Sequence, residues 1–84
     1  MNAKIDIPAI KRRLRQVRSE LGISQREAAD RAGISKSVLE KYESREETRI
    51  PNTRQLFLLA ETYDVSADFL LARNSAYTRT SKDS

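Results

Sequence analysis

The chain has 84 residues, enough for one small domain and too few for a separate catalytic or ligand-sensing domain. It contains no cysteine and no histidine, so we expect no disulfide, no metal, no cofactor and no enzymatic activity. It has neither a transmembrane-length apolar run nor a signal-peptide core, so the expected location is cytoplasmic, in a bacterium or encoded by a phage.

The net charge of +4 is concentrated at the N-terminal end of the chain. Residues 1–21 contain six basic and two acidic residues, and the remainder balances to zero. Such a basic surface suits a polyanionic partner. A solvated helix face would explain the same charges, and composition leaves both interpretations open.

Residues 1–6 are expected to form a short polar arm in front of a helix at Ile7–Leu21. Asp6 is a suitable N-cap, and Gly22 is a suitable C-terminal stop. Apolar residues recur at spacings of three and four, which is one stripe of a helix, at Ile7, Ile10, Leu14, Val17 and Leu21.

Two shorter helices follow, at Gln25–Ala32 and Lys36–Arg45. Ser24 and Ser35 are suitable N-caps for them. Glu27, three residues after Ser24, is placed to reach back and complete a capping box.

The turn between these helices has the pattern of a helix-turn-helix motif. Gly33 stands at the turn, and the small Ala29 stands four residues earlier, where the helices touch. The apolar packing positions are filled by Ile34, Leu39 and Tyr42. In this motif the second helix projects its first residues toward a DNA major groove.

A charged loop at 46–51 leads to a helix that Asn52 caps and that runs to Tyr63. Phe57 and Leu58 make this helix unusually apolar, so we expect more than one of its faces to be covered.

Ser66 is a suitable cap for a last short helix that ends near Ala72. Residues 74–84 are rich in serine and threonine and are expected to form a polar tail. The sequence therefore predicts an all-α domain of five helices over residues 7–73.

Residues 10–74 resemble the Xre-type, lambda-repressor-like (Cro/CI) helix-turn-helix family. The matching pieces are LGISQREAADRAGIS, a helix that ends in LEKYESR, an IPN cap, and LFLLAETYDVSADFLLAR. The last piece distinguishes this family from other helix-turn-helix folds. The resemblance implies a five-helix fold that binds double-stranded DNA.

The resemblance places base contacts on the second helix of the motif, at Lys36, Ser37, Glu40 and Lys41. Lysine can donate to guanine, and serine can serve several bases. Glu40 could accept from cytosine, repel phosphate, or pair with a basic neighbour. We favour a pair with Lys36, four residues earlier.

The resemblance also implies contacts to the DNA backbone. Gln25, the first residue of its helix, matches a family glutamine that bonds a phosphate and braces the recognition helix, and a helix N-terminus favours an anion. An exposed residue in the first turn is the alternative. Further backbone contacts are expected around the next loop and helix start, at Arg45, Arg49, Asn52 and Arg54. Glu46 and Glu47 face phosphate poorly, so the loop is expected to point away from DNA or toward a protein partner.

Arg18 and Glu43 match a family pair that links the first helix to the end of the recognition helix. Removing one member of a buried pair destabilises a protein by roughly 3–5 kcal/mol. We expect this pair to hold the recognition helix, whereas two separate surface charges are the alternative.

Two alanines depart from the family pattern. Ala28 and Ala32 stand where leucine is common. Either their helix sits closer to the core, or the missing volume is refilled by Tyr42 and Phe57.

The resemblance implies a sequence-specific transcriptional regulator, a repressor that binds a palindromic operator as a homodimer. The candidate dimer or partner surface is formed by Tyr63, Phe69, Leu70 and Leu71, unless these belong to the core. The alternative function is a protein-interaction module on the same fold, either an antitoxin bound to its toxin or a regulator held by an antagonist. Loss of DNA binding is the third possibility, and the basic first helix argues against it.

Overall fold

The computed structural model describes residues 5–73, and within them it has helices and turns but no strand. The helices are α1 (Ile7–Leu21), α2 (Gln25–Ala32), α3 (Lys36–Glu43), α4 (Thr53–Tyr63) and α5 (Ala67–Leu70). The predicted all-α, five-helix fold is confirmed. The expected tail at 74–84 and residues 1–4 of the expected arm lie outside the described residues, so that division of the chain stays a prediction.

The N-caps form at the predicted positions. In each case a side-chain oxygen accepts from the backbone N–H three residues later, at 2.8–3.1 Å, and the caps are Asp6, Ser24, Ser35, Asn52 and Ser66. The capping box is incomplete, because Glu27 accepts a hydrogen bond from Arg31 on the outer face of α2.

Glycine ends α1 and α2 in the left-handed conformation. Gly22 has φ 72° and Gly33 has φ 75°. A Cβ at Gly33 would meet no atom, so the backbone conformation alone favours glycine there. The resulting turn joins α2 and α3 tightly over the fully buried Ala29.

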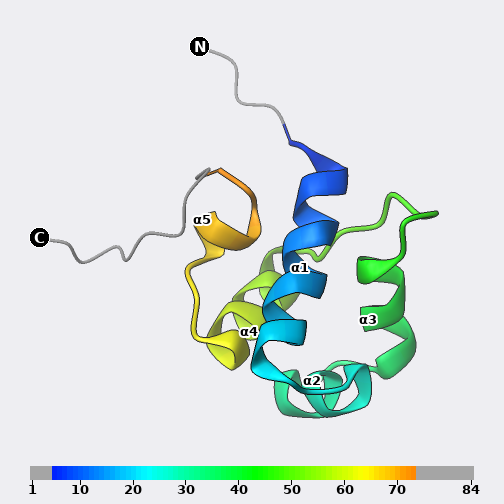
Figure 1. Cartoon of the computed structure of the whole chain (residues 1–84), viewed down its shortest axis with the longest axis vertical. Helices are drawn as coiled ribbons and strands as arrows, with labels where there is room; N and C mark the ends of the chain where they lie inside the picture. The colour runs from blue at the N-terminus through cyan, green and yellow to red at the C-terminus, as the bar shows by residue number, and fades with distance from the viewer. Residues whose placement is uncertain (1–4, 74–84) are drawn as a thin grey trace, which may run out of the picture.

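Figure 1 shows α1 across the front of the molecule, with α4 behind it, α2 below, and α3 and α5 on opposite sides. α1 packs against α3, α4 and α5, whereas α2 packs against α3 and α4. One apolar core joins these elements, and its largest fully buried side chains are Ile10, Leu14, Leu39, Leu59 and Leu70.

Two helices are shorter than predicted. α3 ends at Glu43 rather than Arg45: Ser44 is extended, and the ammonium of Lys11 binds the carbonyls of Lys41 and Tyr42. Those carbonyls would otherwise accept from the N–H groups of residues 45 and 46. α5 ends at Leu70, and Ala72, where the helix was expected to end, has φ 60°.

The expected cover over α4 is incomplete. Leu58 is partly buried against the core, but Phe57 is 59% exposed and fills no volume beside the alanines of α2. Ala28 and Ala32 are buried, and α2 lies directly on α3 and α4. Among residues 5–73, no helix is long and apolar enough to cross a bilayer.

Candidate nucleic-acid interface

One side of α3 is buried and the other is open to solvent. Leu39, Tyr42 and Glu43 are buried, which fixes the orientation of the helix. The predicted base-contact residues lie on the remaining surface, where Ser37 and Glu40 are exposed and Lys36 and Lys41 are partly exposed. Because all four lie in an eight-residue helix, the structure brings them together as the sequence predicted.

Glu40 pairs with Lys36 across one turn of α3, with an N–O distance of 2.5 Å. The predicted pair is therefore confirmed. The hydrogen bond that Glu40 accepts from Lys36 is the main reason that the pKa of Glu40 is lowered. Both side chains are more than 40% exposed, so solvent screens the pair and it contributes little to stability. Lys36 can therefore leave Glu40 for another acceptor at little cost.

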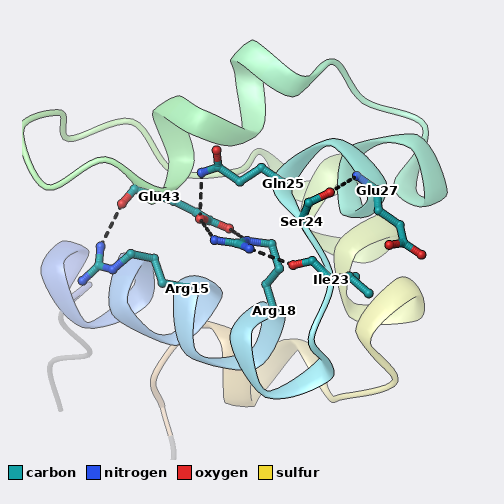
Figure 2. A network of polar contacts seen from close by, with 7 residues as sticks. All are labelled: Arg15, Arg18, Ile23, Ser24, Gln25, Glu27 and Glu43. Atoms are coloured by element: carbon teal, nitrogen blue, oxygen red, sulfur yellow. Dashed lines mark hydrogen bonds and ion pairs between the residues drawn. The ribbon is translucent and has the colours of Figure 1, made fainter.

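A buried carboxylate connects α3 to α1 and α2 (Figure 2). The guanidinium of Arg18 donates to Glu43 through Nε, at 2.8 Å, and through Nη2, at 3.0 Å. Gln25 Nε2 donates to the same carboxylate at 2.9 Å, and Arg18 Nη1 donates to the carbonyl of Ile23. The predicted Arg18–Glu43 contact is confirmed, and its hydrogen bond is the main reason that the pKa of Arg18 is raised.

This network orients Gln25 at the start of α2. A side-chain amide has two N–H donors, and Glu43 takes one of them. The second N–H, together with the free backbone N–H groups of the first turn of α2, forms a group of donors suited to an anion. The expectation that Gln25 braces the recognition helix agrees with this hydrogen bond, although the sequence did not identify Glu43 as its partner.

The basic residues of α1 are largely used inside the protein, which corrects the expectation of a basic surface on this helix. Lys11, Arg15 and Arg18 recur at spacings of four and three, and all three bond to the C-terminal part of α3. Arg13 donates to the carbonyl of Phe69 and lies 4.3 Å from its ring centroid.

Sequence analysis missed this internal role, although a signal for it was present. The basic stripe runs beside the apolar stripe of α1, displaced by one residue from Ile10, Leu14 and Val17. Residues next to a buried stripe border the packed interface, where a long basic side chain can reach carbonyls of a neighbouring helix.

The residues predicted to contact the DNA backbone lie around the α3–α4 loop and the start of α4, and all are exposed: Arg45, Arg49, Asn52 and Arg54. The side-chain oxygen of Asn52 caps α4, so its amide N–H groups remain as donors. Glu46 and Glu47 line a hollow of about 810 Å³ between the loop and the first turns of α1.

The predicted dimer surface is wrong for three of its four residues. Tyr63, Phe69 and Leu70 are at most 7% exposed and belong to the core, because α5 folds onto α1 and α4. Leu71 is partly buried against the same core. The large apolar side chain exposed on α4 is Phe57.

Residues 14–70 match the helix-turn-helix family, which is more than half of the chain. The chain belongs to the Cro/CI-like helix-turn-helix family. Its α2–α3 unit is the motif that names the family, whose members are DNA-binding transcriptional regulators.

Two relatives from Bacillus subtilis (strain 168) are similar to this helix-turn-helix protein. The HTH-type transcriptional regulator ImmR is 33% identical over 72 residues, which are 86% of this chain and 55% of ImmR. The uncharacterized HTH-type transcriptional regulator YobD is 39% identical over 59 residues, 70% of this chain and 51% of YobD. This chain therefore spans about half the length of these relatives.

Proposed function

We propose that this protein is a sequence-specific, double-stranded DNA-binding transcriptional regulator that acts as a repressor. The observation that supports this most directly is the orientation of α3. Its buried side holds Leu39, Tyr42 and the carboxylate network, while its open side presents Lys36 and Ser37 near the N-terminal end. An exposed helix held in this way fits a major groove.

In this proposal the contacts divide into two classes. Lys36, Ser37, Glu40 and Lys41 read base edges, and the Lys36–Glu40 pair opens so that each partner can meet a base. The backbone of the DNA is held by Gln25, Arg45, Arg49, Asn52 and Arg54, which position α3 without reading sequence. Repression follows from occlusion of the promoter.

We further propose that two copies bind a palindromic operator, with one α3 in each half-site. The exposed stripe of α4 supports pairing between copies, since Phe57 lies between Arg54, three residues before it, and Glu61, four residues after it. In an antiparallel α4–α4 contact, each Arg54 would face Glu61 of the second copy. Along α4, Arg54 and Glu61 lie three and four residues from Phe57, so at about 1.5 Å rise per residue their distances from Phe57 differ by roughly 1.5 Å. Flexible side chains can span this difference.

We expect a contact centred on one exposed phenylalanine per copy to bury less than the roughly 1,000 Å² of a stable interface. We therefore expect weak association in solution and pairing that is completed on the operator. Arg54 is also a proposed phosphate contact. Its five N–H donors can bind both the carboxylate of Glu61 from the second copy and a DNA phosphate.

Fluorescence anisotropy tests the DNA-binding proposal. Purified protein is titrated into DNA from upstream of its own gene and into random DNA, at about 150 mM salt. Binding to the upstream DNA that is at least ~10³-fold tighter than to random DNA supports the proposal. Equal, weak binding to both contradicts it and favours a protein-interaction module, for which co-purification of a toxin or antagonist would be the next measurement.

A further inference from the structure

Lys11 lies in the interior although it is a lysine. Only 3% of the surface of Lys11 is exposed to solvent, whereas a lysine is almost never fully buried unless it is paired. The ammonium donates to the carbonyls of Lys41 at 2.7 Å, Tyr42 at 3.0 Å and Arg49 at 2.6 Å. A lysine has three N–H donors, so all of them are used within the protein.

The three acceptors belong to two different elements. The carbonyls of Lys41 and Tyr42 are at the C-terminus of α3, where carbonyls lack helical partners and the helix dipole favours a cation. The carbonyl of Arg49 is in the α3–α4 loop. One ammonium on α1 therefore holds the end of α3 and the loop in a single arrangement.

Few other hydrogen bonds hold this loop. Within the described part of the chain, Arg45–Pro51 are tied to the helices by one hydrogen bond, from Lys11 to Arg49. The other hydrogen bond of this segment is local, from the Glu46 N–H to the Ser44 hydroxyl. Ile50 adds apolar contact with the core.

We propose that Lys11 is a positioning residue for DNA binding, which it promotes by holding the loop arginines in place relative to α3. This inference rests on the proposed function. Arg49 presents its side chain to solvent from the residue whose carbonyl Lys11 holds, and Arg45 is in the same loop. A loop that is ordered before binding loses less entropy when its side chains meet phosphates.

Lys11→Met, Arg12→Met, Arg49→Met and the double variant Lys11→Met/Arg49→Met test this role. Lys11→Met removes the ammonium and keeps the length of the side chain. Arg12→Met removes the same charge from an exposed neighbour on α1 and serves as the matched control. Arg49→Met removes a proposed phosphate contact. Circular dichroism confirms folding, and Lys11→Gln replaces Lys11→Met in every comparison if the methionine variant does not fold. The shorter, neutral glutamine side chain has two N–H donors, so it cannot reproduce all three hydrogen bonds of the ammonium.

The first readout is the backbone order of the loop in the free protein, measured as order parameters from 15N relaxation, which does not depend on DNA. We expect the order parameters of residues 45–50 to fall in Lys11→Met and to stay unchanged in Arg12→Met. Unchanged order parameters in Lys11→Met would overturn the proposal.

The second readout is DNA affinity as a function of salt. Although Lys11 is buried, Lys11→Met should make the slope of log Kd against log salt shallower by about one, as the loss of a phosphate contact does. Arg49→Met should then have a smaller effect in the Lys11→Met background than in the native protein. Additive effects, or a Lys11→Met slope equal to that of Arg12→Met, would overturn the proposal. If the native protein binds no DNA, the positioning role fails with the proposed function, and the order parameters still report whether Lys11 orders the loop.

Discussion

Arg18 and Glu43 meet across 25 residues of sequence through two hydrogen bonds of 2.8 and 3.0 Å. The Glu43 side chain is 2% exposed and that of Arg18 is 20% exposed. The pair joins the last turn of α1 to the last residue of α3. The recognition helix is therefore held through a carboxylate that is almost completely shielded from water.

Removing Arg18 leaves the buried carboxylate of Glu43 without its cation. We expect Arg18→Met to lower the free energy of unfolding by roughly 3–5 kcal/mol, measured by urea unfolding. The double variant Arg18→Met/Glu43→Met should recover part of this loss, because it removes the unpaired charge as well. Arg31→Ala is the control, since its pair with Glu27 is about half exposed and should contribute at most about 1 kcal/mol. Equal losses in Arg18→Met and Arg31→Ala would contradict the structural role.

Substitutions on α3 and α4 should affect DNA binding in different ways. We expect Lys41→Ala to relax base preference, whereas Arg54→Ala should weaken binding to all sequences alike and reduce the salt slope by about one. The measurement is anisotropy with the operator and with single-base variants of it. Arg73→Ala, at an exposed residue after α5, is the control for loss of charge. The same loss of discrimination in both test variants would remove the basis for assigning base contacts to α3.

The hydroxyl of Tyr63 is buried and has no hydrogen-bond partner among the described residues. Burial raises the pKa of Tyr63 to about 12, with the carboxylate of Glu43 acting in the same direction. Tyr63→Phe should therefore be neutral or stabilising by about 1 kcal/mol at pH 7.

The alkaline stability of the native protein should follow from the same pKa. The unfolded chain ionises this tyrosine near pH 10 and the folded protein near pH 12, so the folded state binds the proton more tightly. The raised pKa of Tyr63 therefore adds to the free energy of unfolding. This addition, roughly 2–3 kcal/mol, is complete below pH 10 and is lost as the pH rises toward 12. Urea unfolding between pH 9 and 12 should show this loss in the native protein and lack it in Tyr63→Phe. Parallel curves for the two proteins would contradict the assignment.

Phe57 should matter for self-association more than for folding. Because its side chain is largely exposed, Phe57→Ser is expected to change the free energy of unfolding by less than about 0.5 kcal/mol. Sedimentation equilibrium should show weaker association of Phe57→Ser than of the native protein.

Leu21→Ser removes an apolar side chain of similar exposure from the end of α1 and is the matched control. The charge exchange Arg54→Glu/Glu61→Arg should associate like the native protein, whereas each single reversal should not. Native association in Phe57→Ser would rule out this face.

The starts of the helices follow from local sequence. Each N-cap needs one side-chain oxygen and an N–H three residues later, so Ser24 and Asn52 can be recognised from a few neighbouring residues. The left-handed turn at Gly33 is equally local, because glycine lacks the Cβ that disfavours this conformation. The spacing of Leu39 and Tyr42 also indicated which side of α3 is buried, whereas the candidate base contacts on the open side came from the resemblance to the helix-turn-helix family.

Contacts between distant residues decide the remaining features. Lys11 binds the last carbonyls of α3 from 30 residues away. Phe69 and Leu70, which sequence analysis had placed on a candidate partner surface, are buried where α5 packs against α1 and α4. Periodicity shows that a residue borders an apolar stripe, but it does not show which helix covers that stripe. Whether a charge meets solvent, a carbonyl or a carboxylate depends on how the helices pack, so the internal use of the basic residues of α1 emerges only from the tertiary structure.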